Sequence, residues 1–315
     1  MCVHSPAFFL SPAAMCDPTG LGAFSKRFPD RFYDVGIAEQ HAMTSAAGLA
    51  IGGMHPVVAL YATFLNRAFD QLLMDVALHK LPVTVVLDRA GITGQDGPSH
   101  NGIWDLAMLG MVPGLRIAAP RDEPTLRAEL AEAVEWSAGP TVLRYPKTPL
   151  TEDLLALRRQ GGVDVLSEPA PDGAVDVLVV AVGSMAGDVL EATERVSGEG
   201  FTVRVVDPRW VNPIDPELLV LAKRASLVVT VEDGLEVGGV GSRLAQALQA
   251  AGNTVPTRTI GVPTRFLDHG KVPDVRNAAG LTVQAISRRI VEWTADLAQA
   301  EQSDDAGSFS ADCTD

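Results

Sequence analysis

The feature that most constrains the fold is the alternation of short apolar runs with segments of helical periodicity. Runs rich in Val, Leu, Ile and Ala occur at 57–60, 83–87, 116–119 and 141–143, and apolar residues recur at helical spacing between them, as at 65–76 and 126–134. Strands that alternate with helices indicate a parallel sheet with helices on both faces. The sequence therefore predicts a doubly wound, mainly parallel α/β fold.

The pattern occurs twice, so we expect two domains. The first covers residues 1–150 and the second 174–298. Residues 151–173 are rich in Pro, Gly and charge, which predicts a linker with a short helix around 154–158. The acidic tail, 299–315, is expected to be disordered. The run at 7–10 is too short to predict a strand, so the first sheet is expected to begin abruptly, with an upstream part missing or supplied by another chain.

Charge and cysteine content exclude several classes of function. The formal net charge of −14 argues against nucleic acid or an anionic membrane surface as the main partner. No apolar run is long enough to span a bilayer. Cys2, Cys16 and Cys313 fit no metal or disulfide spacing, so we expect no metal ligands here and a reducing, cytoplasmic location.

Four polar residues follow strand-like runs of the first domain. Glu39 comes shortly after the run 32–35 and Gly36, and Tyr61, Arg89 and Arg144 follow the next runs. Parallel strands end at the same edge of a sheet, where open α/β folds keep their ligands. The sequence thus predicts a carboxylate, a phenol and two guanidinium groups around one crevice.

Each of these residues also has a purely structural interpretation. An isolated Glu in a first helical turn commonly complements the helix dipole. Arginines form bidentate bonds to phosphate or carboxylate, but most of them make surface ion pairs. Phe64 is placed to stack on a flat ring in a turn, or to fill the core.

Two Gly-containing loops are further candidates. The loop GITGQDGPSHNG contains Asp96 and His100, which suit proton transfer, or it is simply a solvated turn. The stretch GLEVGGVGS, 234–242, looks like a phosphate loop but fits no nucleotide pattern. Acidic residues precede it, so we favour close helix packing or a subunit contact.

Together, the stretches DVGIAEQH, YATFLNRAFDQ, LDRAGITGQDGPSHNG and VLRYPK resemble the 1-deoxy-D-xylulose-5-phosphate synthase family, which belongs to the thiamine-diphosphate-dependent transketolase superfamily. The motifs occur in the same order, and the resemblance covers about residues 14–295. It implies a pyrimidine-binding domain followed by a transketolase C-terminal domain.

The resemblance also implies roles for single residues. Glu39 would bond the cofactor aminopyrimidine and act in proton transfer, and Phe64 would stack on that ring with Arg67 nearby. Tyr61, Arg89 and Arg144 would hold a phosphorylated aldehyde, while Asp96 and His100 would line its site and assist proton transfer. The implied reaction joins pyruvate to glyceraldehyde 3-phosphate with loss of carbon dioxide, and its product feeds isoprenoid, thiamine and pyridoxal synthesis.

One element of the family pattern is missing. Members bind the cofactor diphosphate through Mg²⁺ with a GDG motif in an N-terminal domain, and this sequence has no GDG. We therefore expect a C-terminal half that works with a diphosphate-binding half, as a homodimer or a hetero-assembly. The alternatives are an inactive remnant with a dimerising or regulatory role, and a beta-type subunit of a 2-oxo acid dehydrogenase. The loop with Asp96 and His100 argues against the last of these.

Overall fold

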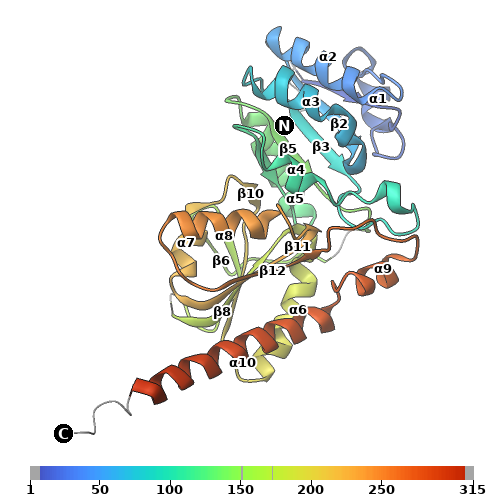
Figure 1. Cartoon of the computed structure of the whole chain (residues 1–315). Coiled ribbons are helices and arrows are strands. Elements are labelled where there is room, and N and C mark those ends of the chain that lie inside the picture. The colour runs from blue at the N-terminus through green and yellow to red at the C-terminus, as the bar shows by residue number, and fades with distance from the viewer. Residues whose placement is uncertain (1–7, 150–151, 172, 309–315) are drawn as a thin grey trace, which may run out of the picture.

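The computed structural model describes residues 8–149, 152–171 and 173–308. They form two α/β units stacked along the long axis of the molecule, and the C-terminal helix projects from the second unit (Figure 1). Each unit has a six-stranded, mostly parallel sheet. The predicted fold class is confirmed.

The first sheet has the strand order β1-β2-β3-β5-β4-β10. Its strands are parallel except β10, which pairs antiparallel with β4 and comes from the second half of the chain. The strands are β1 (Phe8–Pro12), β2 (His55–Tyr61), β3 (Thr84–Asp88), β4 (Arg116–Ala118), β5 (Thr141–Arg144) and β10 (Trp210–Asn212).

Helices cover both faces of this sheet, because alternate strand residues point to opposite sides. One face packs against α2 (Glu39–Ile51), the irregular helix η3–α3–η4 (Ala62–Ala68, Phe69–Gln71, Leu72–Ala77) and α4 (Asp105–Leu109). The other face packs against α5 (Glu123–Glu135). Asp122 caps α5 in a reciprocal capping box with Thr125. The short elements α1 (Gly22–Arg27), η2 (Pro29–Arg31) and η5 (Pro98–His100) lie in the connections.

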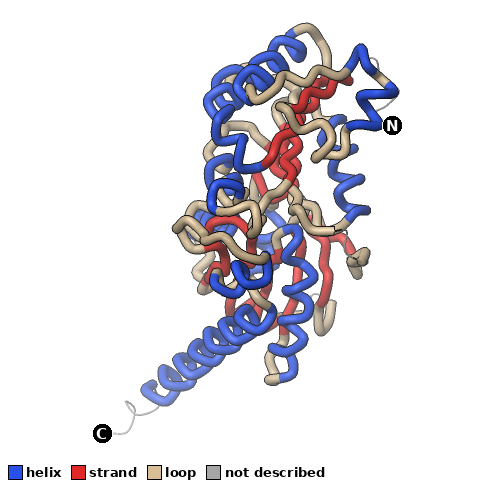
Figure 2. Tube along the Cα trace, turned by 90° about the vertical axis from the view of Figure 1, so that its right-hand side faces the viewer, coloured by secondary structure: helices blue, strands red, loops and turns tan. Residues whose placement is uncertain are grey.

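The second sheet has the order β12-β11-β8-β9-β7-β6. Its parallel part is β8 (Val175–Ala181), β9 (Val203–Asp207), β11 (Ala225–Leu235) and β12 (Thr257–Val262), with the antiparallel pair β6 (Arg158–Gln160) and β7 (Val163–Ser167) at one edge. Helices α6 (Ala186–Gly198) and α10 (Val283–Ser308) pack on one face, and α7 (Pro216–Ala222) and α8 (Val240–Ala250) on the other, which the blue helices flanking red strands show in Figure 2. The remaining elements are η6 (Gly183–Met185) and α9 (Val272–Ala278).

Four local predictions were wrong. The run 32–35 is no strand, since only Phe32 makes a bridge, to Leu10 of β1. The edge strand β1 occupies that place, and Pro12 ends it where no backbone donor is needed. The helix expected at 154–158 is absent, because Arg121 and Asp122 bind the backbone of Leu154 and hold it extended toward β6. Helix α10 continues to Ser308 through the expected tail, and 309–315 lie outside the described residues.

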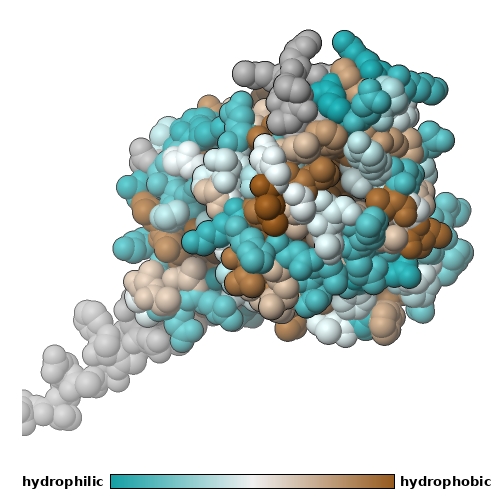
Figure 3. Space-filling view, turned by 90° about the horizontal axis from the view of Figure 1, so that it is seen from above, coloured by the Kyte–Doolittle hydropathy of each residue, from teal (hydrophilic) through white to brown (hydrophobic). Residues whose placement is uncertain are grey.

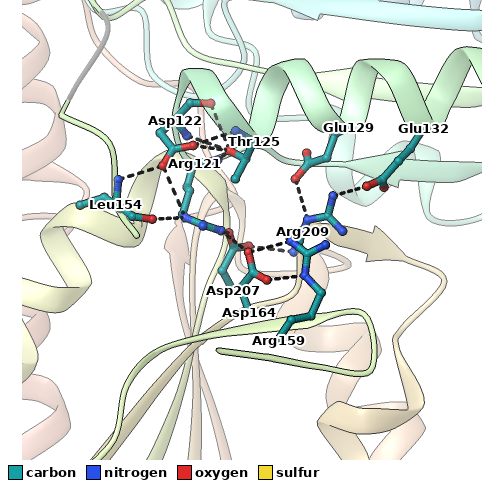
Figure 4. A network of polar contacts seen from close by, with 10 residues as sticks. All are labelled: Arg121, Asp122, Thr125, Glu129, Glu132, Leu154, Arg159, Asp164, Asp207 and Arg209. Carbon is teal, nitrogen blue, oxygen red and sulfur yellow. Dashed lines mark hydrogen bonds and ion pairs between the residues drawn. The ribbon is translucent and has the colours of Figure 1, made fainter. Parts of the chain in front are cut away.

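A buried polar network joins the two units (Figure 4). Arg121, just before α5, donates to Asp164 of β7 and to Asp207 of β9, at 2.7 and 2.6 Å. Arg209 pairs with Glu132 of α5 at 2.5 Å and lies 3.6 Å from Glu129. Buried ion pairs need good geometry to offset desolvation. This network therefore specifies how the units sit against each other.

The first unit also exposes apolar surface. Seen from above, brown and tan residues interrupt the teal surface of this end (Figure 3). Tyr33, Ile37 and Ile51 are 52%, 76% and 71% exposed. A groove of about 780 Å³ lies beside β1 and α2, and Phe9 and Leu49 are among its lining residues. Surface of this kind is typical of protein contacts.

Candidate active site

Glu39 is the first residue of α2 and is only 2% exposed. Its Oε2 lies 3.4 Å from Nη1 of Arg67 in η3. That same oxygen accepts no hydrogen bond from any described residue. Buried polar atoms nearly always have a partner, so this carboxylate oxygen is suited to receive an N–H from a ligand.

A cation and aromatic cluster lies at the ends of β2 and β3. The guanidinium group of Arg89 stands 4.0 Å from the ring centroid of Tyr61. The ring of Phe64 stacks on that of Tyr61 with centroids 5.7 Å apart, and His100 meets Phe64 edge-on at 5.5 Å. Burial raises the pKa of the Tyr61 phenol, so it remains a hydrogen-bond donor near neutral pH. The structure thus brings these four predicted residues together.

The 90–102 loop carries Asp96 into this cluster. Its carboxylate accepts from Nη1 of Arg89 at 3.0 Å and from Nζ of Lys147 at 2.8 and 2.9 Å. The bond from Lys147 is the main reason that the pKa of Asp96 is lowered. Ser99 and His100 share a hydrogen bond of 2.9 Å between Oγ and Nδ1. The loop therefore packs onto the cluster, and a role of Asp96 and His100 in proton transfer stays a prediction.

The backbone at the base of this loop is strained and tightly packed. Arg89 has a φ of +60°, an uncommon conformation for a residue other than Gly. Gly91 and Gly102 exchange two backbone hydrogen bonds of 2.8 Å. A Cβ on Gly102 would lie 2.4 Å from the carbonyl oxygen of Arg89. Such strain persists where the surroundings enforce it, which is common at functional sites.

Arg144 was expected to bind substrate in an open crevice, but its side chain is buried in an ion pair. It lies at the end of β5, but its side chain is 2% exposed. Nε donates to Asp105 at 2.7 Å and Nη1 to Asp233 of β11 at 2.6 Å, while Nη2 has no partner among the described residues. Burial alone would lower its pKa, but the two carboxylates raise it. Arg144 is thus an inter-unit ion pair, and its contact with substrate stays a prediction.

Sequence reasoning missed Lys147 and the carboxylates of Asp105 and Asp233. Lys147 stands in the motif VLRYPK, two residues after Tyr145, and that position at a strand end was the available signal. Asp105 and Asp233 gave none, because their pairing with Arg144 depends on the tertiary fold. A cleft of about 910 Å³ opens beside the cluster and is lined by Arg89, Lys147 and residues 18–20, among others.

The loop 234–242 has the structural role predicted for it. Glu232 accepts from the backbone N–H groups of Val240 and Gly241 at 3.0 and 2.9 Å, at the start of α8. A Cβ on Gly239 would lie 2.3 Å from this carboxylate. An internal carboxylate thus occupies the position where a phosphate would bind.

Within the described ranges, no group of three or more His, Cys, Asp or Glu is arranged to hold a metal ion. Within them, too, no helix is long and apolar enough to cross a bilayer.

The fold and this site define a pyrimidine-binding unit followed by its companion C-terminal domain. Residues 1–152 match the family described as transketolase, pyrimidine binding domain, and residues 169–286 match transketolase, C-terminal domain. A solved structure described as "Split gene transketolase, inactive beta4 tetramer" superposes with a TM-score of 0.80 and 31% identity, covering 94% of each chain.

Curated relatives narrow the family further. The 1-deoxy-D-xylulose-5-phosphate synthase of Frankia casuarinae is 59% identical over 93% of this chain, and that of Mycolicibacterium gilvum is 60% identical over 90%. The chain covers 45% of each of these proteins, so it spans about half of their length. The chain belongs to the transketolase family, in the branch of the 1-deoxy-D-xylulose-5-phosphate synthases.

Proposed function

We propose that this chain supplies the proton-relay and acceptor-binding half of a 1-deoxy-D-xylulose-5-phosphate synthase. The assembled enzyme would condense pyruvate with glyceraldehyde 3-phosphate, with loss of carbon dioxide. The observation that carries the proposal is Glu39, whose buried Oε2 lies 3.4 Å from Arg67 of η3 and accepts no hydrogen bond from any described residue. The names of the curated relatives support the choice of reaction.

The residues present fit thiamine diphosphate. When bound, this cofactor supplies a stabilised carbanion, which attacks carbonyl groups. Glu39 would bond to a ring nitrogen of its aminopyrimidine and share a proton with it, and Phe64 would stack on that ring. Arg67, 53% exposed and 3.4 Å from Glu39, would keep the carboxylate in place. Mg²⁺ and the diphosphate would be held by residues outside this chain.

The acceptor aldehyde would bind at the other end of η3. Arg89 and Tyr61 offer donors for its phosphate, and Nη2 of Arg144 has no partner among the described residues. Asp96 and His100 belong to the cluster beside the cleft and would move protons to and from the acceptor oxygen. The cofactor would thus be activated at the Arg67 end of η3, and the acceptor would bind at the Tyr61 end.

The partner would be a chain with the diphosphate-binding half, joined in a hetero-assembly or with two copies of each half. The apolar groove beside β1 and α2 supports a contact with that half, since no described residue fills it. The solved relative named as a split gene transketolase is described as inactive in its beta4 form. We accordingly expect this chain alone to bind thiamine diphosphate weakly or not at all. Sub-micromolar, Mg²⁺-dependent binding in calorimetry would contradict this expectation.

The decisive test is synthase turnover with pyruvate, glyceraldehyde 3-phosphate, thiamine diphosphate and Mg²⁺. The chain is assayed alone and with the part of the Frankia casuarinae synthase that it does not match. We expect activity only in the mixture, lost in Glu39→Gln and kept in the exposed control Glu123→Gln. Activity of the chain alone would overturn the need for a partner. If neither the chain alone nor the mixture is active, although the two halves form a complex, the chain would be an inactive remnant.

A further inference from the structure

Helix η3, which contains Phe64 and Arg67, also holds the loop that carries His100. The residue before Phe64 is Thr63, whose side chain is largely buried. Its Oγ1 donates to the carbonyl oxygen of Ser99 at 2.9 Å, although the two residues are 36 positions apart in the sequence. Ser99 directly precedes His100 in the 90–102 loop. One hydroxyl group thus joins the turn that carries Phe64 to the loop that carries His100.

Helix η3 is a rigid support for this hydroxyl group. Ala62, Leu65 and Ala68 are at most 1% exposed and belong to the core of the first unit. The base of the loop packs on the same helix, since a Cβ on Gly102 would lie 2.6 Å from the Cβ of Ala62. Among the described residues, the bond from Thr63 is the one hydrogen bond between η3 and the loop. It therefore sets where the loop tip lies on η3.

The position of the Ser99 carbonyl is passed on to His100, because residues 97–101 form a compact turn. The N–H of His100 and Nδ2 of Asn101 both donate to the carbonyl oxygen of Gly97, at 3.1 and 3.3 Å. Asn101 is buried, which fixes this turn from below. Oγ of Ser99 lies 2.9 Å from Nδ1 of His100. A shift of the Ser99 carbonyl therefore moves the imidazole ring as well.

We propose that Thr63 is a positioning residue, whose hydroxyl group holds the 90–102 loop in register with the turn of Phe64 and so fixes the His100 ring beside the Phe64 ring. The centroids of these two rings are 5.5 Å apart, and their planes meet at 72°. The catalytic consequence rests on the proposed function, in which Phe64 stacks on the cofactor and His100 serves the acceptor. The bond from Thr63 then aligns the acceptor with the cofactor.

Other contacts hold the loop without setting this register. The carboxylate of Asp96 is bonded to two cations at the strand ends. Gly94 packs against the second unit, where an added Cβ would lie 2.8 Å from the carbonyl oxygen of Gly270. Neither contact involves η3, so both remain when the hydroxyl group of Thr63 is removed. Its loss should therefore shift the tip of the loop and leave the chain folded.

The first test uses the full chain alone, with NMR of the histidine rings and hydrogen exchange of residues 97–101. Thr63→Val keeps the branched side chain and removes the hydroxyl group. We expect the His100 ring signal, assigned through His100→Gln, to lose most of the ring-current shift that Phe64→Leu abolishes, and exchange to rise. Thr63→Ser keeps the hydroxyl group and should restore both. Thr193→Val, which removes a 2.9 Å bond to a backbone carbonyl in α6, is the matched control.

The second test is steady-state turnover of the mixture with the diphosphate-binding half. A single hydrogen bond is worth roughly fivefold in affinity, so Thr63→Val should raise the KM for glyceraldehyde 3-phosphate roughly three- to tenfold. Half-saturation by thiamine diphosphate should not change, because Glu39 and Arg67 keep their places. Thr63→Ser should again restore the wild-type KM, and Thr193→Val should leave it as it is.

The two tests separate this proposal from the proposed function. An unchanged His100 signal in Thr63→Val, or the same change in Thr63→Ser, would overturn the proposal. An unchanged acceptor KM in a mixture that turns over would overturn it as well. If the ring signal moves as expected but no mixture turns over, wild type included, the proposed function fails while the register set by Thr63 stands.

Discussion

Arg121 offers a sharp test of how the two units are held together. Its Nη1 donates to Asp164 and Asp207 at 2.7 and 2.6 Å, and its Nε donates to the Leu154 carbonyl at 3.0 Å (Figure 4). The three charged side chains are 5%, 2% and 0% exposed. Arg121→Met keeps the length of the side chain and removes its charge.

The substitution leaves two carboxylates without their shared cation. Loss of one partner of a buried pair costs about 3–5 kcal/mol, since the remaining charge stays desolvated. Arg159 still bonds Asp164, at 2.6 Å, so the uncompensated charge falls mainly on Asp207. We therefore expect the lower end of that range, about 3 kcal/mol.

The free energy of unfolding is measured by urea denaturation at pH 8 and pH 5. Burial raises the pKa of Asp207 to about 6 even with Arg121 present. A carboxyl whose pKa is raised on folding loses stability as pH rises from its unfolded value, 3.8, through the folded value. Without Arg121 that pKa rises further, so the deficit of the variant should be larger at pH 8 than at pH 5.

Two further variants serve as controls for the effect of Arg121→Met. Arg127→Met breaks the exposed pair with Glu123, whose side chains are 76% and 38% exposed, and should cost at most about 0.5 kcal/mol. Asp207→Asn combined with Arg121→Met should recover part of the loss. A deficit below about 1 kcal/mol, or one independent of pH, would refute the view that this buried pairing orders the two units.

Two further predictions concern the buried carboxylate of Glu232 in β11 and two glycines in different surroundings. The pKa of Glu232 is raised by burial to about 7 from 4.5, so stability should fall by about 3 kcal/mol between those pH values, and Glu232→Gln should remove most of this slope in urea titrations. Gly102→Ala should lower the midpoint of thermal unfolding and disturb the 90–102 loop, because its Cβ meets backbone at 2.4 Å. Gly48→Ala, in α2 with open space around it, should instead stabilise by about 0.5–1 kcal/mol. A slope unchanged in the Glu232 variant, or equal shifts for both glycines, would contradict the packing described.

Most of the fold was predictable because apolar runs and helical spacing are local signals. The strands β2, β3, β4 and β5 followed from such patterns. The failures came where tertiary contacts decide. β1 is a strand only because it pairs with β2, and residues 154–158 are extended because Arg121 and Asp122 bind Leu154.

The same division applies to the site. Residues at strand ends, such as Tyr61 and Arg89, could be predicted to meet, since parallel strands share an edge. Glu39 and Arg67 lie 3.4 Å apart because α2 and η3 pack against each other, a contact that the sequence did not predict. The burial of Arg144 could not be predicted, because Asp233 reaches it from 89 residues away in the sequence.

Arg144 and Arg121 together explain what the second unit contributes to a site built by the first. Both arginines stand at the carboxyl edge of the first sheet, and both find carboxylates at the strand ends of the second, Asp233 and Asp207. Asp233 also packs against Gly91, where an added Cβ would lie 2.4 Å from its Oδ2. Because Gly91 anchors the base of the 90–102 loop, the ion pairs that join the units also fix the position of the loop base. Changes in the second unit should therefore reach acceptor binding through the loop base, while Glu39, on the far side of η3, stays unaffected.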